Sequence, residues 1–162
     1  MDRKIIDEFE TGGDVLRKAV AGLSHEEMLW QPTRPVELGH WTIQQVVFHL
    51  MDDELIWTFR MKRIIAEDHP KIPGYDESKF AAHLHYDAQD PQAAIQVLDL
   101  NRRLFATVLR KLPDSAFART GEHSEIGVFT LEQGVTWAVE HLHHHVHYIA
   151  MKRKKLGKPL AV

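Results

Sequence analysis

The amino-acid sequence predicts an all-α protein folded as a four-helix bundle with long crossover loops. Four long segments carry apolar residues at helical spacing, and three of them open with a recognisable N-cap pattern. The alternation typical of strands is almost absent, and Ile126–Phe129 is too short to build a sheet. A length of 162 residues and a hydrophobic content of 44% fit one domain over residues 1–162. We therefore expect no sheet of three or more strands.

The helices are predicted from their start and stop signals. Capping boxes at Thr42–Gln45 and Thr130–Gln133 open the second and fourth helices, and Asp90–Pro91 opens the third as an N-cap followed by proline. Gly12–Gly13 weakens the helical pattern inside the first. In chain order, the long helices are predicted at about Lys4–Ala21, Thr42–Glu67, Asp90–Lys111 and Thr130–Lys154.

The connections are marked by proline, glycine and polar residues. Ser24–Glu27 is a capping box that opens a short turn, and Gln31–Pro35 is predicted as an irregular connection. Residues 68–89 form a long loop with one helical turn at 76–82, and residues 114–129 form a second loop. The sequence leaves open whether loop 68–89 covers a functional site.

Composition limits the classes of function. The formal net charge is −3, and the basic residues cluster only at Lys152–Lys155, which we interpret as a solvated helix end, so we expect no nucleic-acid partner. No apolar run reaches membrane-spanning length, and the charged N-terminal segment lacks the apolar core of a signal peptide. We therefore expect a cytoplasmic protein with no membrane partner. The chain has no cysteine, so any thiol chemistry would use a thiol supplied as substrate.

The fourth predicted helix is dense in histidine. Positions 141, 143, 144, 145 and 147 are all histidine, and residues four apart share a helix face. The pairs His141/His145 and His143/His147 therefore each have the spacing that lets two imidazoles reach one divalent ion. The competing interpretation of this segment alone is a solvated polar face that carries scattered histidines.

Helix phase distinguishes the two pairs. At about 100° per residue, His145 lies about 60° and His141 about 100° from the centre of the apolar stripe, both on the same side. His143 and His147 lie about 100° and 140° away on the other side, toward solvent, and His144 points outward. The phases favour His141 and His145 as ligands, although the density of histidine keeps a register based on His143/His147 open.

A third histidine, His49, borders the apolar stripe of the second helix, about 100° from its centre. Asp53 and Arg60 follow on the same flank, whereas Glu54 falls inside the stripe, where a carboxylate needs a partner. Either carboxylate could orient a ligand imidazole or act as a base, and Arg60 or Arg63 could hold an anionic cofactor. The competing interpretation is a plain ion pair between these acids and arginines.

Three motifs resemble the DinB/YfiT-like superfamily of metalloenzymes. Trp41–Glu54 (WTIQQVVFHLMDDE) resembles the second-helix signature of that family, and Glu140–Ile149 (EHLHHHVHYI) resembles its last-helix signature. Leu23–Pro32 and Gly127–Leu131 fit the turns that precede those helices, so the resemblance covers nearly the whole chain. It implies a four-helix bundle that holds one divalent ion of the nickel or zinc type with three histidines. Carried over by position, the ligands would be His49, His141 and His145.

The resemblance implies a metal-dependent enzyme, because some family members are S-transferases or isomerases that act with small-molecule thiols. A three-histidine site leaves a coordination position open, which is typical of catalytic sites. We expect a small-molecule substrate and either transfer of a low-molecular-weight thiol to an electrophile or hydrolysis. The alternative is a non-enzymatic metal-binding bundle of the stress response, sealed by a fourth ligand such as His144 or Asp53. The sequence leaves a homodimer open.

Overall fold

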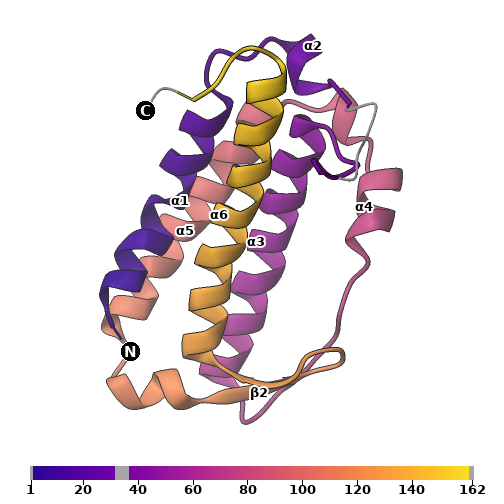
Figure 1. Cartoon of the computed structure of the whole chain (residues 1–162). Coiled ribbons are helices and arrows are strands. Elements are labelled where there is room, and N and C mark those ends of the chain that lie inside the picture. The colour runs from indigo at the N-terminus through magenta and orange to yellow at the C-terminus, as the bar shows by residue number, and fades with distance from the viewer. Residues whose placement is uncertain (1, 32–36, 161–162) are drawn as a thin grey trace.

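The computed structural model describes residues 2–31 and 37–160 and confirms a helical bundle (Figure 1). Residues 32–35 of the predicted irregular connection lie outside the described residues. Across the described ranges, no helix combines the length and the apolar character needed to cross a membrane. In chain order, the helices are α1 (Lys4–Val20), α2 (His25–Met28), α3 (Ile43–Ala66), α4 (Glu77–His83), η1 (Tyr86–Ala88), α5 (Pro91–Lys111), η2 (Asp114–Ala118) and α6 (Leu131–Lys155).

The long helices begin where the capping signals predict. The side chains of Thr42 and Thr130 each accept a hydrogen bond from the backbone N–H three residues on, and the glutamine at that position bonds back to the cap. Asp90 caps α5 through the backbone N–H of Gln92. Local side-chain chemistry therefore determines the starts of α3, α5 and α6.

The four long helices pack in a ring in which α1 and α3 lie diagonally opposite. α1 and α3 each pack against both α5 and α6. Figure 1 shows that α1 and α6 rise from the lower end of the bundle, whereas α3 and α5 descend from the upper end. Neighbours α3 and α5 are thus parallel, and the segment that joins them must return along the whole bundle, which explains its length. α3 and α6 are antiparallel neighbours, so residues on their facing sides meet along a shared seam.

A small sheet corrects one prediction. Within the described residues, strands β1 (Lys71–Ile72), β2 (Thr120–His123) and β3 (Gly127–Thr130) form a three-stranded sheet at the lower end of the bundle. β1 pairs with β2 in parallel, and β2 pairs with β3 as a hairpin. The expectation of no such sheet was wrong because strands this short are fixed by pairing across the fold rather than by their own alternation.

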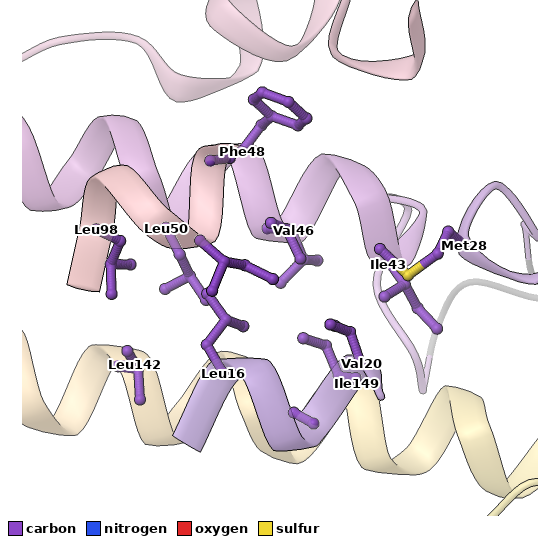
Figure 2. Close-up of a cluster of buried hydrophobic side chains, with 14 of the residues drawn as sticks. Leu16, Val20, Met28, Ile43, Val46, Phe48, Leu50, Leu98, Leu142 and Ile149 are labelled. Carbon is purple, nitrogen blue, oxygen red and sulfur yellow. The ribbon is translucent and has the colours of Figure 1, made fainter. Parts of the chain in front are cut away.

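The upper core is shown in Figure 2. Apolar side chains from α1, α2, α3, α5 and α6 converge there, with Leu16, Leu50 and Leu142 among the fully buried ones. Phe48 points the other way, out of the bundle, and stacks on Tyr86 at a ring distance of 5.1 Å. This contact ties the returning segment to the outer face of α3 and so holds that segment beside the upper half of the bundle.

A buried ion pair crosses the centre of the bundle. Arg102 donates from Nε to Glu54 at 2.7 Å, and both side chains are 3% exposed or less. Its other nitrogens donate to the carbonyls of Phe9 and Ala138, on α1 and α6. Glu54 therefore pairs with an arginine of α5, and not with Arg60 or Arg63 as the sequence suggested.

Gly12 provides the room for that arginine. A Cβ at this position would lie 2.9 Å from Cζ of Arg102, closer than side chains tolerate. The glycine that weakens the helical pattern of α1 is thus required by packing, and α1 continues through it without a break.

The basic run at the end of α6 also differs from the prediction. Lys152 and Arg153 are buried, and only Lys154 and Lys155 face solvent. Lys152 donates to the carbonyl of Leu38, while Arg153 donates to the carbonyls of Ala19 and Ala21. The first two cations therefore satisfy backbone oxygens at the upper end of the bundle rather than forming a solvated helix end.

Candidate metal centre

His49, His141 and His145 come together at the seam between α3 and α6. The Nε2 atom of His141 lies 3.2 Å from Nε2 of His49 and 3.0 Å from Nε2 of His145. One ligand atom from each residue lies within 4.8 Å of the others, and this is the one such cluster of three among the described residues. These are the three residues that helix phase and the family resemblance selected.

The alternative ligand pair, His143 and His147, does not lie at this seam. His143, His144 and His147 are exposed on the outer face of α6, where the rings of His144 and His147 pack beside Tyr148. The loop residues His83 and His85 are exposed as well. The prediction that His143 and His147 face solvent is thus confirmed.

Asp53 fixes the orientation of the central imidazole. Its Oδ2 lies 3.0 Å from Nδ1 of His141, and its Oδ1 accepts a hydrogen bond from the hydroxyl of Tyr75 at 3.1 Å. Because Nδ1 of His141 donates to the carboxylate, the Nε2 lone pair faces the other two histidines. This is the usual arrangement around a metal-ligating histidine, and it gives the orienting role to Asp53 rather than to Glu54.

The electrostatics of the cluster keep the imidazoles of His49 and His145 neutral. Burial, reinforced by the neighbouring His141, lowers the pKa of His49 to about 4 and that of His145 to about 2. Burial opposes ionisation of Asp53, but the hydrogen bond and charge of His141 hold the pKa of this carboxyl below its usual value. Neutral imidazoles beside an ionised carboxylate are the protonation states that a divalent ion requires of its ligands.

A cavity of about 280 Å³ opens on the cluster. Its lining comprises the three histidines together with Trp41, Asp53, Tyr75 and Glu77. The Trp41 ring lies 4.7 Å from that of His49 and is stacked 6.3 Å from that of His145. Burial and the neighbouring Asp53 raise the pKa of Tyr75, so its hydroxyl keeps its proton. The site is therefore open to a small molecule on a side walled by aromatic rings and carboxylates.

Three of these lining residues were missed by the sequence analysis. Trp41 directly precedes the cap of α3, and its place at the start of a ligand helix was a signal that could have been used. Tyr75 and Glu77 lie in the returning segment 68–89, and only the fold brings them to the cluster. Part of that loop does cover the site, which the sequence left open.

The two arginines considered for an anionic cofactor do not line this cavity. Arg60 is buried, donates to the carbonyl of Pro73 and stacks over Trp57 at 4.9 Å. Arg63, in the last turn of α3, pairs with Glu67 at the C-cap of that helix. Among the described lining residues there are two carboxylates and no lysine or arginine.

The donor set fits a divalent transition-metal ion. Three imidazole nitrogens are common ligands of such ions, and a set of three leaves a position for water or substrate. The fixed tautomer of His141 and the neutrality of the other two rings meet the requirement for available lone pairs. His49, His141 and His145 are therefore the residues that would hold the ion.

Two relatives of this chain are named as metal-dependent proteins. The chain is 31% identical to “Putative metal-dependent hydrolase YfiT” of Bacillus subtilis over 124 residues, which cover 76% of this chain and 70% of that protein. It is 30% identical over 148 residues to a protein of Geobacillus thermodenitrificans that is also named a putative metal-dependent hydrolase, with 89% and 79% of the two chains covered.

A solved structure gives the same result for the fold. The structure of YfiT from Bacillus subtilis, described as a probable metal-dependent hydrolase with an unusual four-helix bundle topology, matches with a TM-score of 0.87. The match has 28% sequence identity and covers 95% of this chain and 86% of that one. The family model of the DinB superfamily matches residues 8–149, and the chain therefore belongs to the DinB superfamily.

Proposed function

We propose that this protein is a metal-dependent hydrolase of a small molecule, with one divalent ion held by His49, His141 and His145. The observation that carries the proposal is the convergence of the three Nε2 atoms beside an open cavity. When bound, such an ion supplies Lewis acidity, which lowers the pKa of water and polarises a carbonyl oxygen. The names of the relatives support the same class of reaction.

The two carboxylates in the cavity lining have different roles in the proposed reaction. Both carboxylate oxygens of Asp53 are engaged, one by His141 and one by Tyr75, so this residue positions an imidazole rather than accepting a proton. Glu77 is the other carboxylate in the cavity lining. We assign it the role of general base, which accepts the proton of the attacking water. In the overall reaction, hydroxyl adds to the acyl carbon, the bond to the leaving group breaks, and the leaving group takes up a proton.

Thiol transfer is the second reaction that the family resemblance suggests. Glutathione and bacillithiol carry carboxylates, whereas the described cavity lining carries Asp53 and Glu77 and no lysine or arginine. The lining therefore offers no basic side chain that could pair with the carboxylates of these thiols, which favours hydrolysis over their transfer. The comparison assay is turnover of activated esters and amides with and without added thiol; a rate that depends on thiol would support transfer instead.

The non-enzymatic alternative requires a sealed site. His144 is exposed and, although its ring lies 5.4 Å from that of His145, it is not among the residues whose ligand atoms lie within 4.8 Å of one another. Asp53 contacts the outer nitrogen of His141 rather than the shared centre of the cluster. The cavity of about 280 Å³ also leaves room for substrate. A catalytic site is thus better supported than a closed structural one.

Metal stoichiometry tests the ligand assignment directly. The untagged protein should bind one equivalent of Zn²⁺ by calorimetry and elemental analysis. Substitution of His49, His141 or His145 with alanine should abolish tight binding, while His143→Ala and His147→Ala, from the same helix, should leave it intact. Loss of binding in the two control variants alone would show that the ion uses the outer pair and would overturn the proposal.

A further inference from the structure

A second cavity meets the first at His141. It has a volume of about 380 Å³ and is lined by Trp57, Ile126, Trp137 and His141. His141 also lines the cavity over the histidine cluster, so this one side chain borders both spaces. A group bound in this cavity, against the two indole rings, therefore lies next to the site of the proposed chemistry. The two spaces differ in character, since the carboxylates of Asp53 and Glu77 line only the first.

The indole walls are held in place before any ligand arrives. Trp57 packs against the ring of Phe129 at 5.5 Å and that of Trp137 at 6.0 Å, edge to face in both cases. The guanidinium of Arg60 lies 4.9 Å from the centre of the Trp57 ring. Because these contacts already fix the ring, a ligand would not have to order it, which favours binding of a flat apolar group.

The β2–β3 hairpin supplies the remaining apolar wall. Its turn contains Ile126, a large apolar side chain that is 51% exposed. Gly127 follows with φ of +75°, a backbone conformation that few residues other than glycine adopt without strain. Figure 1 shows this hairpin at the lower end of the bundle, projecting past α3. Val128 in the same hairpin is 59% exposed but does not line the cavity, so it serves as a matched control.

We propose that this indole pocket, formed by Trp57, Ile126 and Trp137, selects substrates that carry an aromatic acyl group. The ring enters the pocket, the hydrolysable bond lies at His141, and the polar leaving part faces Tyr75 and Glu77. The inference rests on the proposed hydrolase function and adds the substrate class to it. An ester or amide of an aromatic acid has the required shape, because its flat apolar ring adjoins the carbonyl that is attacked.

Hydroxamates of two sizes test the pocket by binding rather than by turnover. Acetohydroxamate and benzohydroxamate offer the same zinc-chelating group and differ in a methyl against a phenyl. With the zinc-loaded protein in a calorimeter, benzohydroxamate should bind at least about tenfold tighter, which corresponds to about 1.4 kcal/mol. Ile126→Ser and Trp137→Ala should reduce this preference to about twofold or less. Val128→Ser should preserve it, and the affinity for acetohydroxamate should stay the same in all variants.

The outcomes separate the two proposals. If zinc binds through the cluster and acetohydroxamate binds, but the phenyl ring adds no affinity, the pocket assignment is overturned while the metal site stands. If the preference for benzohydroxamate survives Ile126→Ser, the pocket assignment is equally overturned. This variant changes only an exposed turn, so it should fold even if Trp137→Ala is unstable. Failure of the wild-type chain to bind zinc overturns both proposals, and that result is seen in the preceding titration.

Discussion

Replacing Glu54 with glutamine removes the negative charge from the ion pair at the centre of the bundle and turns one accepting oxygen into a donating amide group. The carboxylate accepts from Arg102 at 2.7 Å, and its other oxygen accepts from Thr58 at 3.1 Å and Asn101 at 3.2 Å. Glutamine keeps the volume but leaves the guanidinium of Arg102, 3% exposed, without a counter-charge.

The expected loss is large because the remaining charge is buried. Breaking a buried ion pair by removing one partner costs about 3–5 kcal/mol of unfolding free energy. The hydrogen bonds from Arg102 to the carbonyls of Phe9 and Ala138 survive, which places the loss toward the lower end of that range. For a urea m-value of about 2 kcal/mol/M, the unfolding midpoint should fall by about 1.5 M.

A matched control lies at the C-cap of the same helix. Glu67→Gln removes the carboxylate of an exposed pair with Arg63, where solvent screens the charges, so the unfolding midpoint should hardly move. Both variants and the wild type would be unfolded in urea at pH 7 in the presence of a chelator. A midpoint for Glu54→Gln within about 0.3 M of Glu67→Gln would refute the reasoning. Zinc stoichiometry should be unchanged in both variants, because Glu54 does not contact the cluster.

Three further outcomes are expected. Asp53→Asn should weaken zinc binding by about 10–100-fold in competition with a chromophoric chelator, whereas Asp52→Asn should not, since Asp52 bonds Tyr86 instead. Burial lowers the pKa of Lys152 to about 8, so between pH 8 and 10 the folded chain loses a proton that the unfolded chain keeps. Unfolding free energy should therefore rise across this range relative to Lys152→Met, and parallel pH profiles would contradict it. Gly12→Ala should lower the unfolding free energy by about 1–3 kcal/mol in urea, because its Cβ meets a guanidinium that cannot move away; an unchanged midpoint would count against this.

The helices were predictable because their signals are local. Thr42, Asp90 and Thr130 cap their own helices, and each cap depends on atoms two or three residues away. The three histidines were predictable for a related reason. His141 and His145 share a face by helix geometry, and a border position next to an apolar stripe faces a neighbouring helix. No distant contact had to be known to place them.

What the sequence did not predict depends on partners far along the chain. β2 forms because it pairs with β1 and β3, and the partner of Glu54 lies 48 residues away on α5. The burial of Lys152 follows from a backbone carbonyl 114 residues earlier, at Leu38. Helix phase alone predicts which side of the helix a residue lies on, but not which group of another element it contacts. Tyr75 and Glu77 were missed for the same reason.

The ring order of the helices has a consequence for the folding pathway. His49 and His141 are separated by 92 positions along the chain, yet their imidazoles meet because α3 and α6 are antiparallel neighbours. A metal ion between them would close one of the longest loops in the fold, much as a cross-link does, and it would bind only after α6, the last helix, has docked. If α6 docks after the barrier to folding, the ion would act chiefly on the rate of unfolding, because its bonds would be absent from the transition state.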